Sequence, residues 1–184
     1  MPEGPSIVIL KEQAAHFAGQ RIVEVSGNSR QDLQRMHGLQ VLAICSWGKH
    51  FLLAFDGFAL RIHFLLFGSS RIDDPKPDVA LLDQDLFAGV GNIIKNEVLF
   101  RIRVHPESEV GALPPRKLGE LVKQAREYSF DFLEWKKAYV LKKHYQVHTK
   151  TTCPRDGTRL SYRKELGRAR RRAFFCETCQ KLYR

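Results

Sequence analysis

The cysteines near the end of the chain limit its possible folds more than any other feature of the sequence. Cys176 and Cys179 form a Cys-x-x-Cys pair, and Cys153 precedes them, with Asp156 where a second pair would end. Four ligands at this spacing are typical of structural zinc, around which a small module folds. We therefore predict one structural Zn²⁺ ion held by Cys153, Asp156, Cys176 and Cys179.

Two alternatives to this ligand set stay open. Aspartate is a less common ligand than cysteine in structural zinc sites, and His148 is another candidate for the fourth position. A hairpin without metal would depend instead on packing by Leu160, Tyr162, Phe174 and Phe175. The remaining cysteine, Cys45, lies in an apolar run, and we predict that it is a small core residue.

Positive charge is concentrated at the C-terminal end of the chain. Residues 136–184 contain fifteen Lys and Arg against three acidic residues, a net charge of +12, whereas the other 135 residues sum to −2. This distribution favours an anionic partner such as nucleic-acid phosphate. No apolar run approaches the ~18 residues of a membrane span, so we expect a soluble, intracellular protein without a membrane partner.

The first five residues, Met1-Pro2-Glu3-Gly4-Pro5, offer a reactive group. Removal of the initiator methionine would leave Pro2 with a free secondary amine, and the pKa of an α-amino group is about 8. Such an amine attacks a sugar aldehyde carbon and forms an iminium, as catalytic lysines do. Glu3 is one peptide bond away and is placed to exchange protons with the attacked group.

Apolar periodicity and turn signals predict both helices and strands. Ser6 is a candidate cap for the first helix, and Asp56-Gly57 indicates a tight hairpin turn. Gly89 and Gly91 allow the backbone amides ahead of a later helix to face an anion, with Asn92 as its cap. The predicted elements are helices over 6–20, 81–87, 92–100 and 116–141, a helical turn over 32–36, and strands over 21–25, 40–45, 51–55 and 58–64.

Several of these motifs recur in the same order in one protein family. They are Met1 to Pro5, Trp47-Gly48-Lys49-His50-Phe51, Leu81-Leu82-Asp83-Gln84-Asp85, Gly89-Val90-Gly91-Asn92-Ile93 and the C-terminal cysteine hairpin. The chain resembles the formamidopyrimidine-DNA glycosylase / endonuclease VIII family of base-excision repair enzymes.

The resemblance implies an α+β fold in three parts. An N-terminal helix with an antiparallel β-sandwich would occupy residues 1–78, a helix–two-turn–helix DNA-binding domain residues 79–148, and a zinc-finger β-hairpin residues 149–184. Only nine residues separate Arg71 from Leu81, where family members have a further half of the sandwich. The sandwich is therefore expected to be shortened, with open sheet edges and an exposed apolar face.

The resemblance also implies a bifunctional DNA glycosylase and abasic-site lyase that removes oxidised bases. Pro2 would attack C1′ of the damaged nucleotide, Glu3 would protonate the opening sugar, and Lys49 and Arg171 would assist catalysis. The residues expected to bind DNA are Leu66, which fills the space left by the extruded nucleotide, and Asn92, Lys150 and Arg171.

The expected partner is double-stranded DNA with an oxidised base or an abasic site, bound by a monomer. The expected location is the cytoplasm, associated with a bacterial-type nucleoid. Two other functions stay open from the sequence. One is a catalytically inactive DNA-binding remnant of the same family, and the other is a basic zinc-hairpin protein that binds structured RNA.

Overall fold

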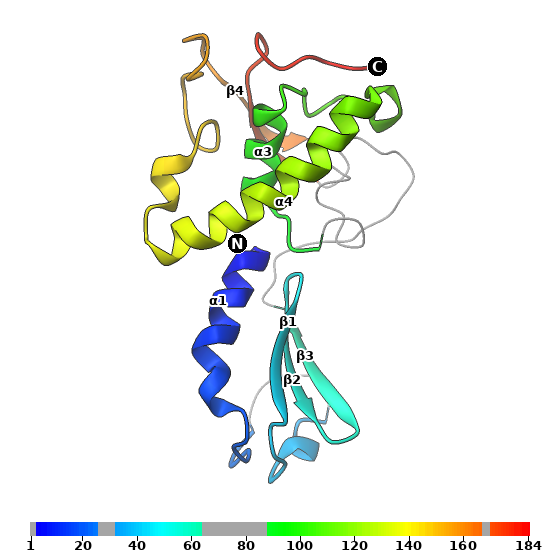
Figure 1. The fold of residues 1–184 in the computed structure, drawn as a ribbon, viewed down its shortest axis with the longest axis vertical. Coiled ribbons are helices and arrows are strands. Elements are labelled where there is room, and N and C mark those ends of the chain that lie inside the picture. The colour runs from blue at the N-terminus through cyan, green and yellow to red at the C-terminus, as the bar shows by residue number, and fades with distance from the viewer. Residues whose placement is uncertain (1–2, 26–31, 64–87, 167–169) are drawn as a thin grey trace.

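The computed structural model describes four stretches of the chain, residues 3–25, 32–63, 88–166 and 170–184. Within them, the helices and antiparallel strands divide between two parts along the long axis of the molecule (Figure 1). One part contains the first helix and a three-stranded sheet. The other contains two further helices and a two-stranded hairpin. The predicted α+β class is confirmed.

The first helix, α1 (Gly4–Ala14), begins earlier than predicted and continues into a 3₁₀ turn at Ala15–Phe17. The prediction that Ser6 caps this helix is wrong, because Glu3 is the N-cap residue and proline occupies the first turn. A proline there costs no helical hydrogen bond, since the first amides of a helix have no partner within it. Ser6 Oγ instead accepts a 2.6 Å hydrogen bond from Lys136 Nζ.

Three antiparallel strands follow in the order β1 (Ala43–Trp47), β2 (His50–Phe55) and β3 (Phe58–His63). The predicted Asp56-Gly57 turn joins the last two strands, with Gly57 at φ +76°. The short helical turn predicted ahead of the sheet is also present, as a 3₁₀ turn at Gln34–Met36. The strand predicted over residues 21–25 contributes only an isolated bridge to Gln40.

The two faces of this sheet differ in what they contact. Ile44 and Leu53 lie on the face turned toward α1, where they line an apolar hollow together with Leu10. Cys45 lies on the opposite face and is exposed, so the prediction that it belongs to the core is wrong. Adjacent strand residues point to opposite faces, and a short apolar run does not reveal which of them points inward.

The second part is built around α3 (Asn92–Arg101) and α4 (Pro115–Lys137), close to the predicted helices. Short 3₁₀ turns at Val110–Ala112 and Leu141–His144 flank α4. The two helices share one apolar core, whose buried members are Val90, Ile94, Val98, Leu99, Ile102, Val104, Leu113, Leu121, Ala125, Tyr128 and Phe132. The helix predicted over residues 81–87 lies outside the described part of the chain.

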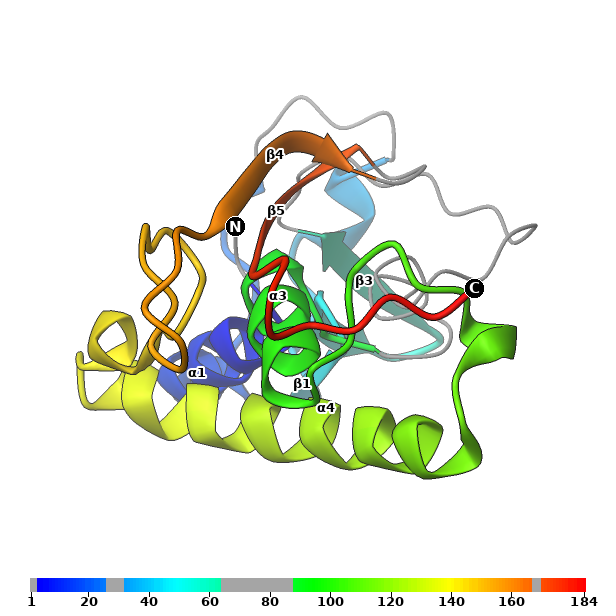
Figure 2. The same cartoon turned by 90° about the horizontal axis from the view of Figure 1, so that it is seen from above.

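The C-terminal hairpin consists of β4 (Ser161–Leu166) and β5 (Arg171–Phe175). Seen from above (Figure 2), α3 lies between the long helix α4 and this hairpin. None of the helices in the described residues is both apolar enough and long enough to span a lipid bilayer. The domain boundaries after residues 78 and 148 stay predictions, and the first of them lies outside the described residues.

Candidate active site and metal centre

Three backbone segments meet at the start of α1 through glycines. Gly4 N donates a 2.8 Å hydrogen bond to Gly89 O. A Cβ atom on Gly4 would lie 2.7 Å from Gly89 Cα and 3.2 Å from Gly48 O, which is closer than a side chain tolerates. Gly48 and Gly89 have φ values of +56° and +94°, which glycine adopts without strain. The start of the chain, the β1–β2 turn and the entrance to α3 therefore come together.

Glu3 lies at the centre of this junction and is only 1% exposed. Its Oε1 accepts a 2.9 Å hydrogen bond from Ile93 N, and its Oε2 accepts a 3.4 Å hydrogen bond from Ile94 N. These amides belong to the first turn of α3, where a negative charge also interacts favourably with the helix dipole. A Cβ atom on Gly91 would lie 2.5 Å from Glu3 Cδ, so Gly91 leaves the room that the carboxylate occupies.

The surroundings of Glu3 raise the pKa of its carboxyl group. Burial raises the pKa of Glu3, and this effect outweighs the opposing effects of the Ile93 amide, Lys49 and the Ile94 amide. A carboxyl group with a raised pKa retains its proton at a higher pH than an exposed glutamate does. This property suits a group that donates a proton to a substrate.

Lys49 reaches the junction from the two-residue turn between β1 and β2, where Trp47 pairs with His50. Gly48 supplies the positive φ that the first position of such a turn requires. Burial lowers the pKa of Lys49, Glu3 raises it, and Arg171 lowers it further. Arg171 is the first residue of β5. The same electrostatic interactions thus connect Glu3, Lys49 and Arg171, which are far apart in the sequence.

The other predicted DNA-binding residues have different placements. Asn92 is the first residue of α3 and is buried, and its Oδ1 has no hydrogen-bond partner among the described residues. Lys150 is exposed and ends a turn in which its backbone amide donates a 3.0 Å hydrogen bond to Val147 O. Pro2 and Leu66 lie outside the described residues.

The expected role of the α3 entrance needs two corrections. Gly91, and not Asn92, is the N-cap residue of α3. The backbone amides that the sequence suggested for an external anion instead hold the carboxylate of Glu3. The anion at this helix terminus is therefore part of the protein itself, contributed by a residue about 90 positions earlier in the chain.

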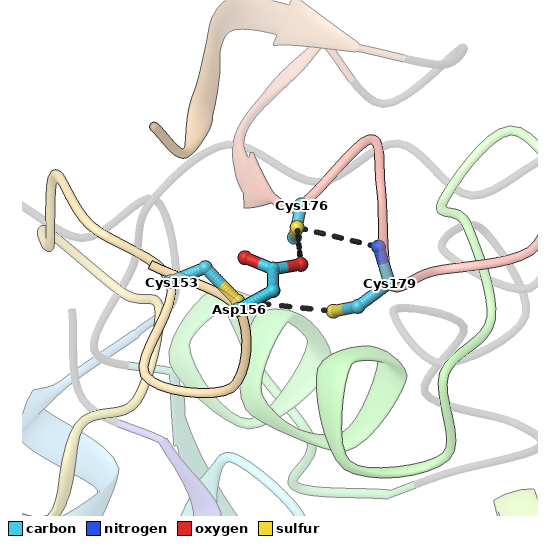
Figure 3. A group of neighbouring side chains, drawn as sticks. All are labelled: Cys153, Asp156, Cys176 and Cys179. Carbon is cyan, nitrogen blue, oxygen red and sulfur yellow. Dashed lines mark hydrogen bonds between the residues drawn. The ribbon is translucent and has the colours of Figure 1, made fainter. Parts of the chain in front are cut away.

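The predicted metal ligands do converge. Figure 3 shows Cys153, Asp156, Cys176 and Cys179 pointing toward one another from two loops, and their ligand atoms all lie within 4.8 Å of one another. Cys153 Sγ is 3.8 Å from Cys179 Sγ, and Cys176 Sγ is 3.2 Å from Asp156 Oδ2. A tetrahedral zinc ion with zinc–sulfur bonds of ~2.3 Å places its sulfur ligands ~3.8 Å apart, so this donor set fits the metal.

The structure favours Asp156 over His148 as the fourth ligand. Asp156 Oδ1 accepts hydrogen bonds from the amide of Thr158 at 3.0 Å and from its hydroxyl at 2.6 Å, while Oδ2 faces Cys176. The Thr158 hydrogen bonds hold the pKa of Asp156 well below its usual range, which leaves an ionised oxygen for the metal. His148 lies outside the cluster, and its Nδ1 is 3.0 Å from the side-chain nitrogen Nδ2 of Asn96.

Two further residues organise the site and were missed by sequence reasoning. Arg155, between two candidate metal ligands, donates to Phe100 O at 2.8 Å and to Arg101 O at 3.1 Å, and so closes the C-terminal end of α3. Glu97 is fully buried on α3 and accepts hydrogen bonds from three consecutive amides at residues 146–148. In the sequence, Glu97 stands out only as a charged residue between the apolar positions Ile94 and Val98.

Comparisons with known proteins agree with this arrangement. Residues 72–138 match the H2TH domain of formamidopyrimidine-DNA glycosylase. The chain is 40% identical to Endonuclease 8-like 3 of Xenopus laevis over 102 residues (55% of this chain and 16% of the relative). It is 32% identical to the Homo sapiens protein of the same name over 158 residues (84% and 24%). It is 31% identical to formamidopyrimidine-DNA glycosylase of Pelotomaculum thermopropionicum over 116 residues (55% and 41%).

Solved structures show the same fold. A complex of the Lactococcus lactis glycosylase Fpg with DNA containing an abasic site superimposes with a TM-score of 0.82, at 18% identity, covering 97% of this chain and 99% of the other. MutM in complex with DNA containing carbocyclic 8-oxo-G gives a TM-score of 0.84, at 18% identity, covering 98% and 100%.

Two limits set what these similarities mean for this chain. At 18% identity the structural likeness concerns the fold alone. The chain also spans a quarter or less of the Endonuclease 8-like 3 relatives. Taken together, the matched H2TH domain, both groups of relatives and the shared fold show that this chain belongs to the formamidopyrimidine-DNA glycosylase / endonuclease VIII family.

Proposed function

We propose that the chain is a DNA glycosylase and abasic-site lyase that removes oxidised bases in base-excision repair. The observation that carries this proposal is the buried Glu3 carboxyl at the first turn of α3, with Lys49 beside it. A buried carboxyl with a raised pKa contributes little to stability by itself, and such groups cluster where proton transfer takes place. The glycine contacts of Gly4, Gly48 and Gly89 hold this carboxyl in place before any substrate binds.

In the proposed reaction, the amine of Pro2 attacks C1′ of the damaged nucleotide. The bond from C1′ to the base breaks, and the base leaves with the bonding electrons and takes up a proton. Glu3 donates its proton to the ring oxygen as the sugar opens, which leaves an iminium between Pro2 and C1′. Loss of a proton from C2′ then expels the 3′ phosphate, and a second elimination expels the 5′ phosphate.

The cationic groups near Glu3 have a second role in this proposal. Lys49 and Arg171 lie within electrostatic reach of each other and would bind the phosphates beside the lesion. Asn92 sits at the α3 entrance and Lys150 on an exposed turn, from which they would contact the flanking backbone. Leu66 would fill the space left in the base stack, as an apolar side chain lowers the cost of extruding a nucleotide.

The metal in this proposal is structural. Zinc bound by Cys153, Asp156, Cys176 and Cys179 would hold the loops at the two ends of the hairpin together and so position Arg171 on β5. Two observations on relatives support DNA as the partner. One Fpg structure of the same fold contains abasic-site DNA, and the MutM structure contains 8-oxo-G DNA.

Covalent trapping tests the proposal. Borohydride reduces an iminium, so incubation with abasic duplex DNA and borohydride should yield a stable protein–DNA adduct. The Pro2→Gly variant should form at least about tenfold less adduct, and mass spectrometry of the adduct peptide should place the link at the mature N-terminus. A control protein with one extra residue before Pro2 keeps every side chain but blocks the proline amine, and it should form no adduct.

The second candidate is a DNA-binding remnant without catalytic activity. It is favoured by the nine-residue connection between Arg71 and Leu81, which leaves little chain for further strands. The trapping experiment separates the two candidates. Binding to abasic duplex without any adduct, in a preparation whose mature N-terminus is Pro2, would support the remnant and contradict the glycosylase.

A further inference from the structure

The face of the three-stranded sheet opposite to α1 carries a row of aromatic rings near the candidate active site. Trp47 pairs across the strands with His50, and His50 pairs with His63. The Trp47 and His50 rings are nearly parallel, at 8°, with centroids 6.1 Å apart, and the centroids of the two histidine rings are 4.7 Å apart. We name Trp47, His50 and His63 the aromatic row.

The aromatic row lies on the face of the sheet opposite to α1. Alternation along β1 places Trp47 and Cys45 on this face, whereas Ile44 lines the hollow against α1. Trp47 is 58% exposed, and Cys45 is exposed as well. Tryptophan is highly buried on average in folded proteins, whereas more than half of the surface of Trp47 is accessible here.

The chemistry around the indole suits one class of ligand. Arg61 lies on the same face as the histidines, diagonally across from His50. Burial, His63 and Arg61 all lower the pKa of His50, which favours the neutral imidazole. The patch thus combines an accessible π-face with a cation at its edge, the combination by which proteins bind unpaired bases of single strands.

We propose that Trp47 is a stacking platform for an unpaired nucleobase of a single DNA strand, with a phosphate of that strand held by Arg61. The inference rests on the DNA-binding part of the proposed function and adds a site outside the Glu3 junction. The ligand is a base with a free face, which undamaged duplex DNA does not present. Stacking of one base on an aromatic side chain contributes on the order of 1–3 kcal/mol, which corresponds to a change of about 5- to 150-fold in affinity.

The chain offers a direct optical test because it contains only two tryptophans. The second, Trp135, stacks on His144 at 4.1 Å and is half-buried. In the Trp135→Phe variant, Trp47 is therefore the only tryptophan reporter. Titration with a short oligothymidylate should quench its fluorescence, whereas undamaged duplex should quench it little. Absence of quenching at oligonucleotide concentrations that saturate binding would overturn the proposal.

Affinities of variants provide the second readout. Trp47→Ala should weaken binding of the oligothymidylate about 5- to 150-fold, and Trp47→Phe should retain most of the affinity. Phe130→Ala is the matched control, because Phe130 is an aromatic residue with a similar exposure, 60%, on α4. An equal loss for oligothymidylate and undamaged duplex, or an equal loss in Trp47→Ala and Phe130→Ala, would contradict a stacking site. Tighter binding of an RNA oligonucleotide would contradict the assignment to DNA.

Failure of this inference is distinct from failure of the proposed function. Quenching without any borohydride-trapped adduct would retain the platform and remove the lyase activity. An adduct without quenching would retain the lyase and remove the platform. Melting temperatures of the variants complete the test, because a purely structural role of the aromatic row predicts a loss of stability that affects all ligands alike.

Discussion

Both ends of α3 are closed by charged side chains from distant parts of the chain, but the two ends differ in burial. At the N-terminal end, the carboxylate of Glu3 accepts hydrogen bonds from the Ile93 and Ile94 amides and is almost completely buried. At the C-terminal end, the guanidinium of Arg155 donates to Phe100 O and Arg101 O and remains exposed. Each charge has the sign that the helix dipole favours at its end.

The difference in burial suits Glu3 to proton transfer and Arg155 to holding a loop against α3. Removal from water raises the pKa of Glu3, and this makes the carboxyl a suitable proton donor at a cost to stability. Arg155 stays solvated, so its charge costs little and its hydrogen bonds serve to dock the metal loop on the helix. One helix therefore connects the candidate active site with the metal centre, and each end can be disrupted separately.

The largest expected effect lies at the metal end. Cys176→Ser should abolish metal binding and unfold the β4–β5 hairpin, since structural zinc contributes on the order of 10 kcal/mol to modules of this kind. Asp156→Ala should weaken metal binding without abolishing it, because three thiolates remain. Metal content of the purified proteins and competition with a chelator measure both effects.

The reciprocal change at the same position sharpens this prediction. Asp156→Cys supplies a fourth thiolate, the commoner ligand in structural zinc sites, and should raise the resistance of the bound metal to chelators. If Asp156→Ala holds metal as tightly as the unchanged protein does, Asp156 is not a ligand. The three thiolates would then hold the metal without it.

At the buried end, Glu3→Gln should lower the rate of adduct formation about 10²- to 10⁴-fold, the usual contribution of a general acid. Glutamine keeps the size of the side chain and one oxygen that accepts from the α3 amides, so the fold should persist. Because burial raises the pKa of Glu3, the reaction should slow as the pH rises through that pKa. Single-turnover trapping across a pH series measures this profile.

The stability of the protein gives an independent check of the same pKa. The folded state binds more protons than the unfolded state at pH values between the ordinary glutamate pKa of 4.5 and the raised pKa of Glu3. The contribution of Glu3 to stability therefore falls as the pH rises through this interval. Glu3→Gln should remove that slope from a plot of melting temperature against pH, and an unchanged slope would show that folding does not raise the pKa of Glu3.

Local signals predicted the elements of this fold well. Asp56-Gly57 correctly indicated the β2–β3 hairpin, and the apolar periodicity correctly placed α3 and α4. Cys45 was misplaced because a run of apolar residues does not distinguish the two faces of a strand. The strand predicted over residues 21–25 is an isolated bridge, since residues with strand propensity pair only where a partner strand is available.

The contacts that build the candidate site were less accessible from the sequence. The candidate metal ligands were found because their spacing is itself the signal. The sequence favoured Asp156 as the fourth ligand, but only the geometry set His148 aside. The hydrogen bonds of Glu3 to α3 and of Arg155 to its far end join residues more than fifty positions apart. Such pairings leave no local pattern, because they depend on how whole elements pack.

The smallest expected effect lies at the exposed end of α3. Arg155→Ala removes two hydrogen bonds to helix carbonyls and the stacking of the guanidinium on the Phe100 ring, whose centroid is 3.9 Å from Arg155 Cζ. Hydrogen bonds from a charged donor contribute about 1.5–3 kcal/mol when buried, and exposure reduces this value, so we expect a loss of about 1–2 kcal/mol in unfolding free energy. Denaturant unfolding of the metal-loaded protein measures this loss.

Two further variants decide whether Arg155 acts as the comparison of the two helix ends requires. Arg155→Lys keeps the positive charge, but a single ammonium group does not reproduce the two parallel hydrogen bonds, so it should recover only part of the loss. Arg159→Ala removes another exposed arginine from the same loop and should leave stability unchanged within about 0.5 kcal/mol. If Arg155→Lys recovers the full stability, the helix dipole alone explains the contact. If Arg155→Ala lowers metal affinity instead of unfolding free energy, Arg155 acts through its 3.7 Å contact with Cys179 Sγ, and the docking role is wrong.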